Sequence, residues 1–374
     1  MKIGIDITPL IFKGSGVANY TYNLVKNLLD IDKKNEYSLF FTSPRINKKF
    51  AFLDEFKNLG AKIYRFPYPF MFFQLLCGKL NIIPIEWFIG KVDFFISSDI
   101  LRPPASIKTF TTIHDLIWKI YPQYHEEFIV KAHEDKIKKI IERGDEIISD
   151  SISTRYDLIK YFPHINKYQI HVIYPGIGEQ FQSIKDIKKI AEVLKRYTLH
   201  AIRYILYVGA IEPRKNLDKA IEVFNELIKD KKYKDFHFLI IGSAGWKNER
   251  IYKLTSQLGL EDKVKFVGFV KDEDLPYFYS GAKLTVYLSS YEGFGIPPLE
   301  SLACGTPVLA GDNSSLKETL PQKFLVDVEN KGKILEKMND LLKTKHEINS
   351  DEFKKRFQWK ESAKRYLEII SGSV

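Results

Sequence analysis

Short apolar runs, rich in β-branched and aromatic residues, alternate along the first half of the chain with segments of helical spacing. The runs are KIGID, EYSLFFT, AKIYRF, VDFFISS, KTFTTIHD, EIISD and QIHVIYP, and the helical pattern ANYTYNLVKNLLD follows the first of them. Such alternation is typical of parallel sheets whose strands are joined by crossover helices. Residues 1–174 are therefore predicted to form one doubly wound, Rossmann-like α/β domain.

The same alternation starts again after the turn YPGIG at residues 174–178. Its strands are RYILYVGA, FHFLIIGSAG, VKFVGFV and KLTVYLSS, and its helices are NLDKAIEVFNELIKD, residues 249–258, DEDLPYFYSGA and a short helix near Pro298. This predicts a second Rossmann-like domain over residues 175–355, facing the first across a cleft, with a Pro-Gly hinge between them. The amphipathic segment DEFKKRFQWKESAKRYLEII is expected to bring residues 356–374 back onto the first domain.

Composition agrees with a two-domain globular protein. The chain has 374 residues, of which 45% are hydrophobic and 28% charged, which is enough for two packed cores. No run approaches the roughly 20 apolar residues of a spanning helix, and the N-terminus resembles a strand rather than a signal peptide, so a cytoplasmic location is expected. Cys77 and Cys304 lie far apart without a C-x-x-C or His-rich partner set, which predicts neither a disulfide framework nor a zinc site.

The net charge of +10 narrows the class of partner. The excess is shared roughly equally between the two halves, without an arginine-rich arm or a nucleic-acid-binding motif, so nucleic acid is the least favoured partner. The remaining candidate partners are an anionic lipid surface and a phosphorylated small molecule.

The stretch SSYEGFGIPPLESLACGTPVLA, residues 289–310, carries the first candidate site. Two prolines and a later glycine predict a short helix over 298–304, whose N-terminal amides suit a diphosphate. Glu292 and Glu300 flank this helix start, and carboxylates accept well from neighbouring hydroxyls, so a nucleotide-sugar fits the layout. Taken alone, Glu300 also fits a charge that complements the helix dipole, and Glu292 a solvated loop residue.

Three further loops follow predicted strands. Arg214 and Lys215 in YVGAIEPRKN can neutralise phosphate oxygens, although a solvated basic loop has the same pattern. Gly14-Ser15-Gly16 can approach a ligand closely, but Asn19 occupies the third glycine position of a G-x-G-x-x-G motif and there is no Walker lysine, so neither a Rossmann cofactor nor ATP is predicted. A plain turn is the alternative.

His114 ends the strand TFTTIHD, where it can contact a sugar hydroxyl or assist proton transfer, with Asp115 as the residue expected to orient it. A structural histidine is the competing interpretation. Asp272-Glu273-Asp274 matches a metal-binding D-x-D pattern but precedes a helix, which favours a cap. The aromatic stretch over 64–76 fits either buried core or an exposed wedge that rests on a membrane.

In their order along nearly the whole chain, these motifs resemble the retaining GT-B glycosyltransferases of family four, in particular the branch with bacterial mannosyltransferases of O-antigen and capsule assembly. The resemblance is carried by TIHDLIWKIYPQYH, VIYPGI, YVGAIEPRKN, VKFVGFVKDEDLP and YEGFGIPPLESLACGTPVL, the last of which contains the E-x7-E signature of that group. One departure is Ala210, where many relatives have an arginine that Arg214 would have to replace.

The resemblance implies a role for each matching residue. Glu292 would hold the donor sugar beside the reacting carbon, and His114 would contact it near the acceptor. Glu300 would bind the ribose, and Arg214 and Lys215 the diphosphate. The remaining donor-binding positions implied by the resemblance are Gly14, Gly16, Phe294, Gly295, Ile296 and Leu299.

The implied activity is retaining, metal-independent transfer of a hexose, with GDP-mannose as the favoured donor, to a saccharide or lipid-linked oligosaccharide in cell-surface polysaccharide synthesis. No cofactor is implied beyond the nucleotide-sugar substrate, and the protein would lie in the cytoplasm or on the inner face of the membrane. A GT-B epimerase, a glycosyl phosphorylase and a non-catalytic nucleotide-binding subunit of an assembly complex are the alternatives.

Overall fold

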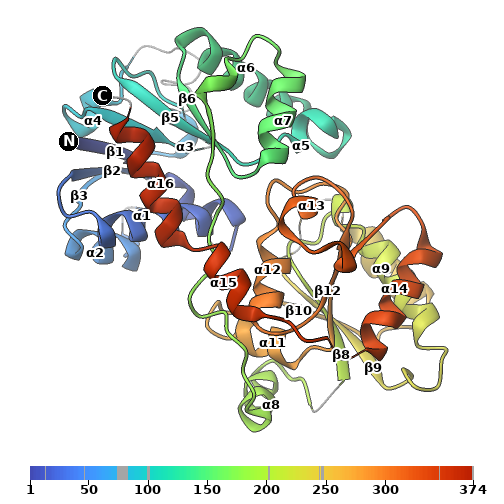
Figure 1. Ribbon diagram of the computed structural model, residues 1–374. Coiled ribbons are helices and arrows are strands. Elements are labelled where there is room, and N and C mark those ends of the chain that lie inside the picture. The colour runs from blue at the N-terminus through green and yellow to red at the C-terminus, as the bar shows by residue number, and fades with distance from the viewer. Residues whose placement is uncertain are drawn as a thin grey trace. The chain divides into compact units, whose positions relative to one another are not determined.

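A computed structural model describes residues 1–372 of the chain, except for 13, 46, 74–82, 99–101, 201–202, 244, 246–247 and 345. The chain divides into two compact units, residues 1–176 with 359–374 and residues 177–358 (Figure 1). Each unit contains one parallel sheet, so the predicted α/β class with two Rossmann-like domains is confirmed.

The first unit is built on a seven-stranded parallel sheet with the order β3-β2-β1-β4-β5-β6-β7. Its strands are β1 (Lys2–Asp6), β2 (Glu36–Thr42), β3 (Lys62–Phe66), β4 (Phe94–Ser97), β5 (Lys108–Ile113), β6 (Glu146–Ser149) and β7 (Ile170–Val172). Its helices are α1 (Gly16–Ile31), α2 (Ala51–Asn58), α3 (Phe70–Phe73), α4 (Glu86–Ile89), α5 (Ile117–Ile120), α6 (Glu127–Arg143), α7 (Ile152–Tyr161) and α16 (Trp359–Ser371). The direction of winding changes between β1 and β4, which creates a switch point at their carboxyl ends.

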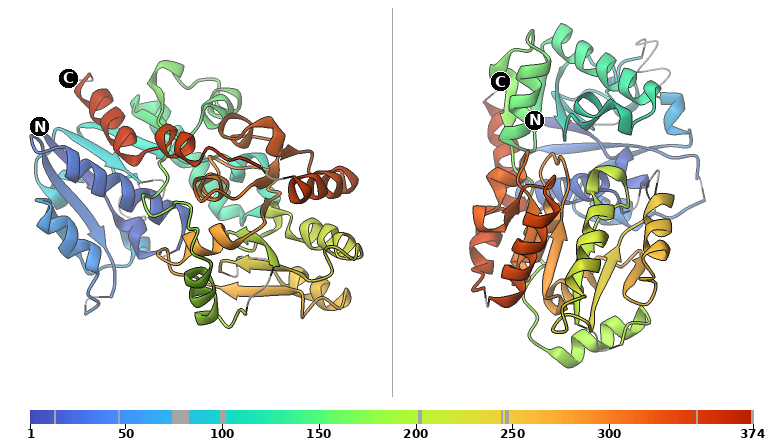
Figure 2. Two further views of the ribbon diagram at one scale, coloured as in Figure 1. Left: turned by 60° about the horizontal axis from the view of Figure 1, so that its bottom comes forward. Right: turned by 90° about the vertical axis from the view of Figure 1, so that its right-hand side faces the viewer.

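Helix α16 packs against α1, and both views of this unit show them side by side (Figures 1 and 2). Ser15 caps α1 by accepting from the amide of Ala18, and the helix then buries Leu24 and Leu28. Ile370 of α16 lies in the same core cluster. The prediction that the C-terminal helix returns to the first domain is thus confirmed.

The predicted C-terminal helix is two helices. α15 (Ser350–Arg356) belongs to the second unit, and α16 begins at Trp359. Between them Phe357 has an extended backbone, and its carbonyl accepts from the amide of Ile177 at 2.9 Å. In a continuous helix the carbonyl of Phe357 would accept from an amide of the same helix, whereas here the amide of Ile177 satisfies it. The helix predicted from the sequence is therefore interrupted at this point.

The second unit has a six-stranded parallel sheet with the order β10-β9-β8-β11-β12-β13. Its strands are β8 (Arg203–Val208), β9 (Phe236–Ile241), β10 (Val264–Gly268), β11 (Leu284–Tyr287), β12 (Val308–Gly311) and β13 (Leu325–Val326). Its other helices are α8 (Ile187–Arg196), α9 (Leu217–Leu227), α10 (Glu249–Gln257), α11 (Leu275–Gly281), α12 (Ile296–Ala303), α13 (Leu316–Thr319) and α14 (Lys331–Lys343).

The winding of this sheet reverses between β8 and β11, so a second switch point lies where these strands end. The turns after β8 and β9 approach each other so closely there that a Cβ on Gly242 would lie 1.9 Å from the carbonyl oxygen of Gly209. Only glycine fits this position, where φ is +143°.

The aromatic stretch over 64–76 is partly core and partly surface. Tyr64, Phe66 and Phe73 pack into one cluster with Phe40, whereas residues 74–76 lie outside the described part of the chain. Tyr68 and Phe72 are 46% and 41% exposed, with ring centroids 4.9 Å apart. Of the two cysteines, Cys77 also lies outside the described residues, and Cys304 is a buried free thiol.

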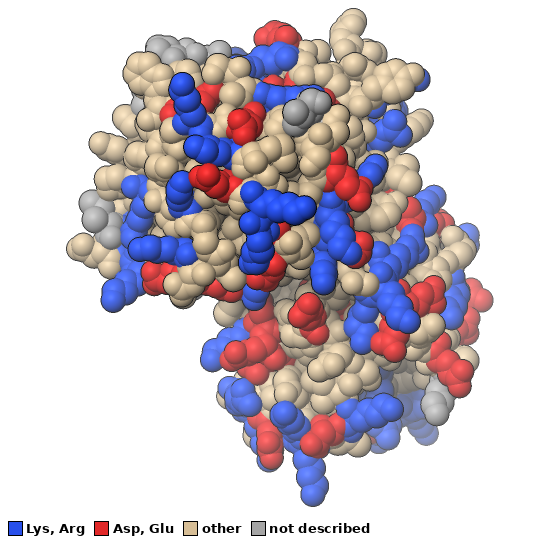
Figure 3. All heavy atoms as spheres, turned by 60° about the vertical axis from the view of Figure 1, so that its left-hand side comes forward, with Lys and Arg blue, Asp and Glu red and all other residues tan. Residues whose placement is uncertain are grey.

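Within the described residues, none of the helices is both long enough and apolar enough to span a bilayer. On the face shown in Figure 3, lysines and arginines are interspersed with aspartates, glutamates and uncharged residues. The net positive charge of the sequence is therefore not gathered into a single basic patch on that face.

Candidate active site

The two loops that follow β8 and β11 meet at the switch point of the second unit. The amide of Ser290 donates to the carbonyl oxygen of Arg214 at 2.9 Å. The side-chain amide of Asn216 donates to the carbonyl oxygen of Leu288 and to the hydroxyl of Ser290, both at 2.8 Å. The motifs EPRKN and SSYEGFG, which are 77 residues apart when measured from Lys215 to Glu292, thus form one structure. Ligands of open α/β sheets bind at such a place.

A cluster of charges occupies this place. Oε1 of Glu292 lies 2.9 Å from NH1 of Arg214 and also accepts from Nζ of Lys215. Lys215 donates a second hydrogen bond to the hydroxyl of Tyr287 at 2.7 Å, and its ammonium lies over the ring of that tyrosine. Nε of Arg214 lies 2.6 Å from Oε1 of Glu212. Glu292 and Lys215 are only 7% and 5% exposed, so the solvated-loop interpretations of both motifs are wrong.

Burial and charge act in opposite directions on this cluster. Burial alone would raise the pKa of Glu292, but the charges of Arg214 and Lys215 outweigh it and lower the pKa to about 2. Burial, together with the charge of Arg214, lowers the pKa of Lys215. Glu292 is therefore an ionised carboxylate at neutral pH, held beside two cations in a nearly dry environment, where charges interact more strongly than in water.

The backbone of Glu292 is fixed by residues that the sequence analysis did not single out. Its amide donates to the hydroxyl of Ser314 at 2.9 Å, and its carbonyl oxygen accepts from the hydroxyl of Ser315 at 2.9 Å. Tyr287 was also missed, because an apolar run with one tyrosine has the pattern of an ordinary core strand.

Helix α12 begins at Ile296, two residues earlier than predicted. Gly295 precedes it in the left-handed region, with φ of +87°, and Pro297 and Pro298 lie in the first turn, where their missing amides cost nothing. Phe294 is buried against Phe357, with ring centroids 5.5 Å apart. The side chain of Leu299 is fully buried in the packing of the helix.

Glu300 is buried and lies beyond the first turn of α12, so its interpretation as a charge that complements the helix dipole is also wrong. Its Oε2 accepts from the hydroxyl of Tyr279 at 2.8 Å, and it is 5% exposed. Burial raises its pKa to about 8 despite this hydrogen bond, with a further contribution from the charge of Asp272. Glu292 and Glu300 therefore differ in protonation at neutral pH, which their shared motif does not indicate.

Glu300→Gln is expected to unfold at a higher temperature than the wild type above pH 8. The carboxyl has a pKa of about 8 in the folded protein against its ordinary value of 4.5, so the folded protein loses stability as the pH rises from 4.5 through 8. A neutral amide avoids this cost and can still accept from Tyr279. A gain of several degrees in Tm at pH 8.5 that disappears at pH 4.5, measured by calorimetry without nucleotide, is the predicted result.

The control for this measurement is Glu226→Gln, which changes an exposed carboxylate paired with Lys229. Surface pairs contribute little, so its Tm should follow the wild type at both pH values. Equal Tm values for Glu300→Gln and the wild type at pH 8.5 would show that Glu300 is ionised in the folded protein at no cost.

In the first unit, His114 follows directly after β5, and its Nδ1 lies 2.6 Å from Oδ2 of Asp150. Asp115, which was predicted to orient His114, accepts from the amide of Ile117, the first residue of α5, at 3.0 Å. The reason is register: Ile113 pairs with Ser149, so the next residue on each strand, His114 or Asp150, emerges at the same edge of the sheet. Asp150 was missed because the sequence does not say that β5 and β6 are neighbours.

Gly14 and Gly16 lie at the start of α1, in the same unit. Gly14 has φ of +81°, a conformation that favours glycine, and a Cβ on Gly16 would meet nothing within 4 Å. The backbone at Gly16 is thus open to close approach.

The acidic D-x-D pattern forms part of a helix start. Asp274 occupies the cap position of α11, although its carboxylate accepts from the hydroxyl of Tyr197 at 2.7 Å and from Arg196 at 3.1 Å rather than from the helix backbone. Within the described residues, no group of three or more His, Cys, Asp or Glu side chains is arranged to hold a metal ion.

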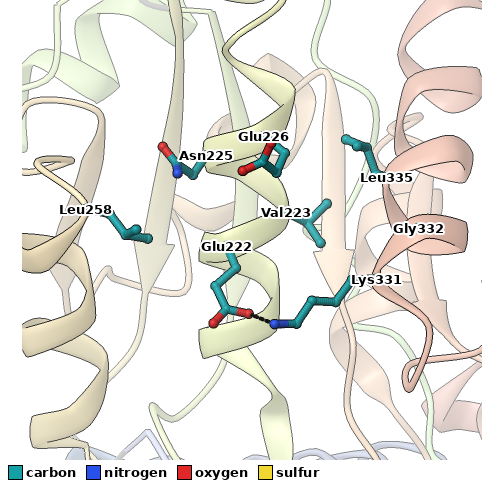
Figure 4. Close-up of a pocket in the computed structure, with 8 residues that line it drawn as sticks. All are labelled: Glu222, Val223, Asn225, Glu226, Leu258, Lys331, Gly332 and Leu335. Carbon is teal, nitrogen blue, oxygen red and sulfur yellow. Dashed lines mark ion pairs between the residues drawn. The ribbon is translucent and has the colours of Figure 1, made fainter.

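A groove of about 410 Å³ lies elsewhere in the second unit, between α9 and α14 (Figure 4). An ion pair between Glu222 and Lys331 crosses it, and Val223 and Leu335 lie along it. The residues that line it include none of the candidate site residues. The buried charges at the switch point, and not this groove, mark the candidate site.

Comparison with known proteins gives one matching family model and several similar proteins. A family model described as glycosyl transferases group 1 matches residues 195–366. The O-antigen chain mannosyltransferase B of Escherichia coli is 27% identical over 336 residues, which cover 87% of this chain and 86% of that protein. The serotype-specific mannosyltransferase WbdA of Escherichia coli is 30% identical over 275 residues, which cover 69% of this chain but 33% of that protein. The resemblance seen in the sequence is confirmed by these matches.

Solved structures agree on the fold. The sucrose-phosphate synthase of Thermosynechococcus elongatus has a TM-score of 0.77 at 19% identity and covers 100% of this chain and 98% of its own. Anabaena HepE, solved in complex with UDP-glucose, has a TM-score of 0.76 at 16% identity, with both chains covered completely. At these identities the likeness shows the fold alone, which is GT-B.

Proposed function

A family model described as glycosyl transferases group 1 matches residues 195–366, and from this match we propose that the chain is a member of that family which moves a hexose from a nucleotide-sugar to a saccharide acceptor with retention of configuration. The observation that carries the proposal is the buried cluster of Arg214, Lys215 and Glu292 at the switch point of the second unit. Mannose from GDP-mannose is the favoured donor, because the two relatives described above, which cover 87% and 69% of this chain, are named as mannosyltransferases.

In this proposal the donor diphosphate replaces Glu292 as the partner of the two cations. The amides at Phe294, Gly295 and Ile296, at the positive end of α12, add to the same positive potential. Glu292 is then free to accept hydrogen bonds from the hydroxyls of the donor sugar. Glu300, which lies in α12, binds the ribose of the nucleotide. The exchange keeps every buried charge paired at each stage, which a dry site requires.

Transfer breaks the bond between C1 of the sugar and the diphosphate oxygen and forms a bond between C1 and the acceptor oxygen. Negative charge grows on the leaving phosphate, where Arg214 and Lys215 stabilise it, and positive charge grows on the sugar, where the carboxylate of Glu292 stabilises it. The acceptor hydroxyl attacks from the face that the phosphate leaves and gives its proton to that phosphate. Because two side-chain cations neutralise the leaving group, the mechanism needs no divalent metal.

We assign the acceptor side to the first unit, where His114 is oriented by Asp150 at the end of β5. The acceptor class that fits the relatives is a saccharide or a lipid-linked oligosaccharide of a cell-surface polymer. An excess of ten positive charges and the exposed pair Tyr68 and Phe72 would favour binding to the anionic inner leaflet of the membrane.

The experiment that tests this function is a thermal shift of the full chain against GDP, UDP, ADP and their hexose conjugates, in buffer with a metal chelator. A ligand that binds only the folded state adds RT ln(1 + [L]/Kd), about 2.7 kcal/mol at a hundredfold excess over Kd. GDP and GDP-mannose are expected to raise the Tm, and free mannose is the control that should not. Stabilisation by none of the nucleotides would overturn the donor site.

A product assay separates the transferase from its alternatives. Release of GDP together with a new glycosidic bond on a saccharide acceptor supports transfer. Conversion of the donor without an acceptor would indicate an epimerase, and a requirement for inorganic phosphate would indicate a phosphorylase. Tight nucleotide binding without turnover would leave a non-catalytic assembly subunit.

A further inference from the structure

A network of buried hydroxyls joins the C-terminal helix to the strand that carries His114. The hydroxyl of Tyr366 in α16 lies 2.8 Å from that of Tyr20 in α1 and 2.9 Å from that of Thr112 in β5. All three side chains are buried, and Thr112 is two residues before His114 on the same strand. Segments from the two ends of the chain and from its middle therefore meet at one point of the first unit (Figure 1).

Tyr20 also contacts His114 directly. The ring of Tyr20 meets the imidazole edge to face, with centroids 4.7 Å apart and an interplanar angle of 79°. Trp359, the first residue of α16, meets the same tyrosine ring at 5.3 Å and 77°. Tyr20 is thus held by α16 at two places, through Trp359 against its ring and through Tyr366 at its hydroxyl.

Two of the contacts of the imidazole constrain its orientation. Asp150 fixes Nδ1, and the ring of Tyr20 limits how far the imidazole can turn about that hydrogen bond. Burial raises the pKa values of both Tyr20 and Tyr366, so both remain neutral hydroxyls whose hydrogen bonds have fixed directions.

Packing alone does not account for this choice of residues. A phenylalanine at position 366 would fill nearly the same volume, whereas hydroxyls placed in a core must find partners or cost stability. A fully satisfied buried network specifies one arrangement of the side chains that it joins. Here the arrangement so specified includes a residue that we assign to the acceptor side of the reaction.

We propose that Tyr366 is a positioning residue for His114, which it acts upon through Tyr20 and Thr112. The inference rests on the proposed transferase function for its kinetic consequence, but its structural claim concerns the imidazole alone. The C-terminal helix thereby has a part in catalysis without contacting either substrate.

The test is Tyr366→Phe in the full chain, which removes one oxygen and keeps the ring. Loss of orientation is expected to lower kcat about tenfold, since small displacements of a reacting group have effects of this size or larger. The donor KM and the Tm shift given by GDP should not change, because the donor loops belong to the second unit.

A matched control is Tyr37→Phe. Tyr37 is another buried tyrosine of the first unit, on β2, and its hydroxyl donates to Asp32 at 2.6 Å. This variant also loses a hydrogen bond, but at a place unconnected with His114, so its kcat should stay within about twofold of the wild type. An equal loss of kcat in both variants would overturn the proposal, because it would reflect general destabilisation.

A double-mutant cycle independently tests whether Tyr366 acts through His114. If Tyr366 acts through the imidazole, Tyr366→Phe should have no further effect on kcat once His114→Ala is present. The same factor in both backgrounds would show that Tyr366 acts by some other route and would contradict the proposal.

An NMR measurement keeps the inference separate from the proposed function. The ring ¹⁵N shifts of His114 are expected to report a proton on Nδ1, toward Asp150, in the wild type and in Tyr37→Phe, and a changed tautomer mixture or broadened signals in Tyr366→Phe. Unchanged shifts would refute the positioning role. If the wild type transfers no sugar at all, the proposed function fails, and these spectra still decide whether Tyr366 positions His114.

Discussion

Glu292→Gln is expected to slow sugar transfer by about 10²–10³-fold, the range seen when one preorganised electrostatic contact to a transition state is removed. The amide keeps the shape of the side chain, and its backbone remains held by Ser314 and Ser315. What is lost is the negative charge beside the carbon that becomes positive. The loss should therefore appear in kcat as well as in kcat/KM, measured as GDP released at saturating donor.

The matched control is Glu329→Gln, in which an exposed carboxylate that pairs with Lys219 becomes neutral. Because this pair lies at the surface, its loss should leave both the rate and the Tm close to the wild type. A rate of sugar transfer for Glu292→Gln equal to that of the wild type would contradict the electrostatic role of Glu292, whatever the effect of the substitution on stability.

Glu292→Gln should also lose stability, with a defined pH dependence. The folded-state pKa of about 2 lies below the ordinary glutamate value of 4.5, so the ionised carboxylate stabilises the fold above pH 4.5 and this contribution is lost as pH falls toward 2. The variant should be less stable by about 3 kcal/mol at pH 7, since it removes the carboxylate charge that pairs with Arg214 and Lys215. The difference in urea unfolding should shrink steadily below pH 4.5.

The sequence predicts all seven strands of the first sheet and four of the six strands of the second, because strand and helix periodicities differ clearly in a doubly wound fold. The short strands β12 and β13 were not predicted. It also places Arg214, Lys215 and Glu292 at the ends of strands. The order of the strands, however, is a property of the folded sheet. The two donor loops meet because β8 lies beside β11, and His114 pairs with Asp150 because β5 lies beside β6. The local sequence pattern does not predict which strands are neighbours.

The burial of individual side chains, like the order of the strands, could not be predicted from the sequence. The E-x7-E spacing assigns Glu292 and Glu300 to one motif, yet one is ionised beside two cations and the other is protonated at neutral pH beside a tyrosine. The tyrosines that partner this site, Tyr279 and Tyr287, have the pattern of core aromatics and are core aromatics. Only their hydroxyls, which the folded structure aims at Glu300 and Lys215, distinguish them from phenylalanine.

Lys215→Ala is expected to abolish the stabilisation of the protein by nucleotide and to lower kcat/KM by about 10³-fold. Lys215 is 5% exposed, and its ammonium is aimed by Tyr287 and Glu292, so it is a preorganised cation that water does not screen. Without it the diphosphate meets Arg214 alone. Since leaving-group charge is largest in the transition state, kcat should fall together with the affinity for GDP.

Lys219→Ala is the control, because Lys219 is the next lysine along the chain and pairs with Glu329 rather than with the site. Its Tm shift with GDP should equal that of the wild type. Lys215→Arg tests whether charge alone suffices: a guanidinium is larger and planar, and it does not fit the buried position from which the Lys215 ammonium donates to both Tyr287 and Glu292, so little activity should return. Full nucleotide binding by Lys215→Ala would mean that the donor phosphates are held elsewhere, and the assignment of this switch point as the donor site would have to be abandoned.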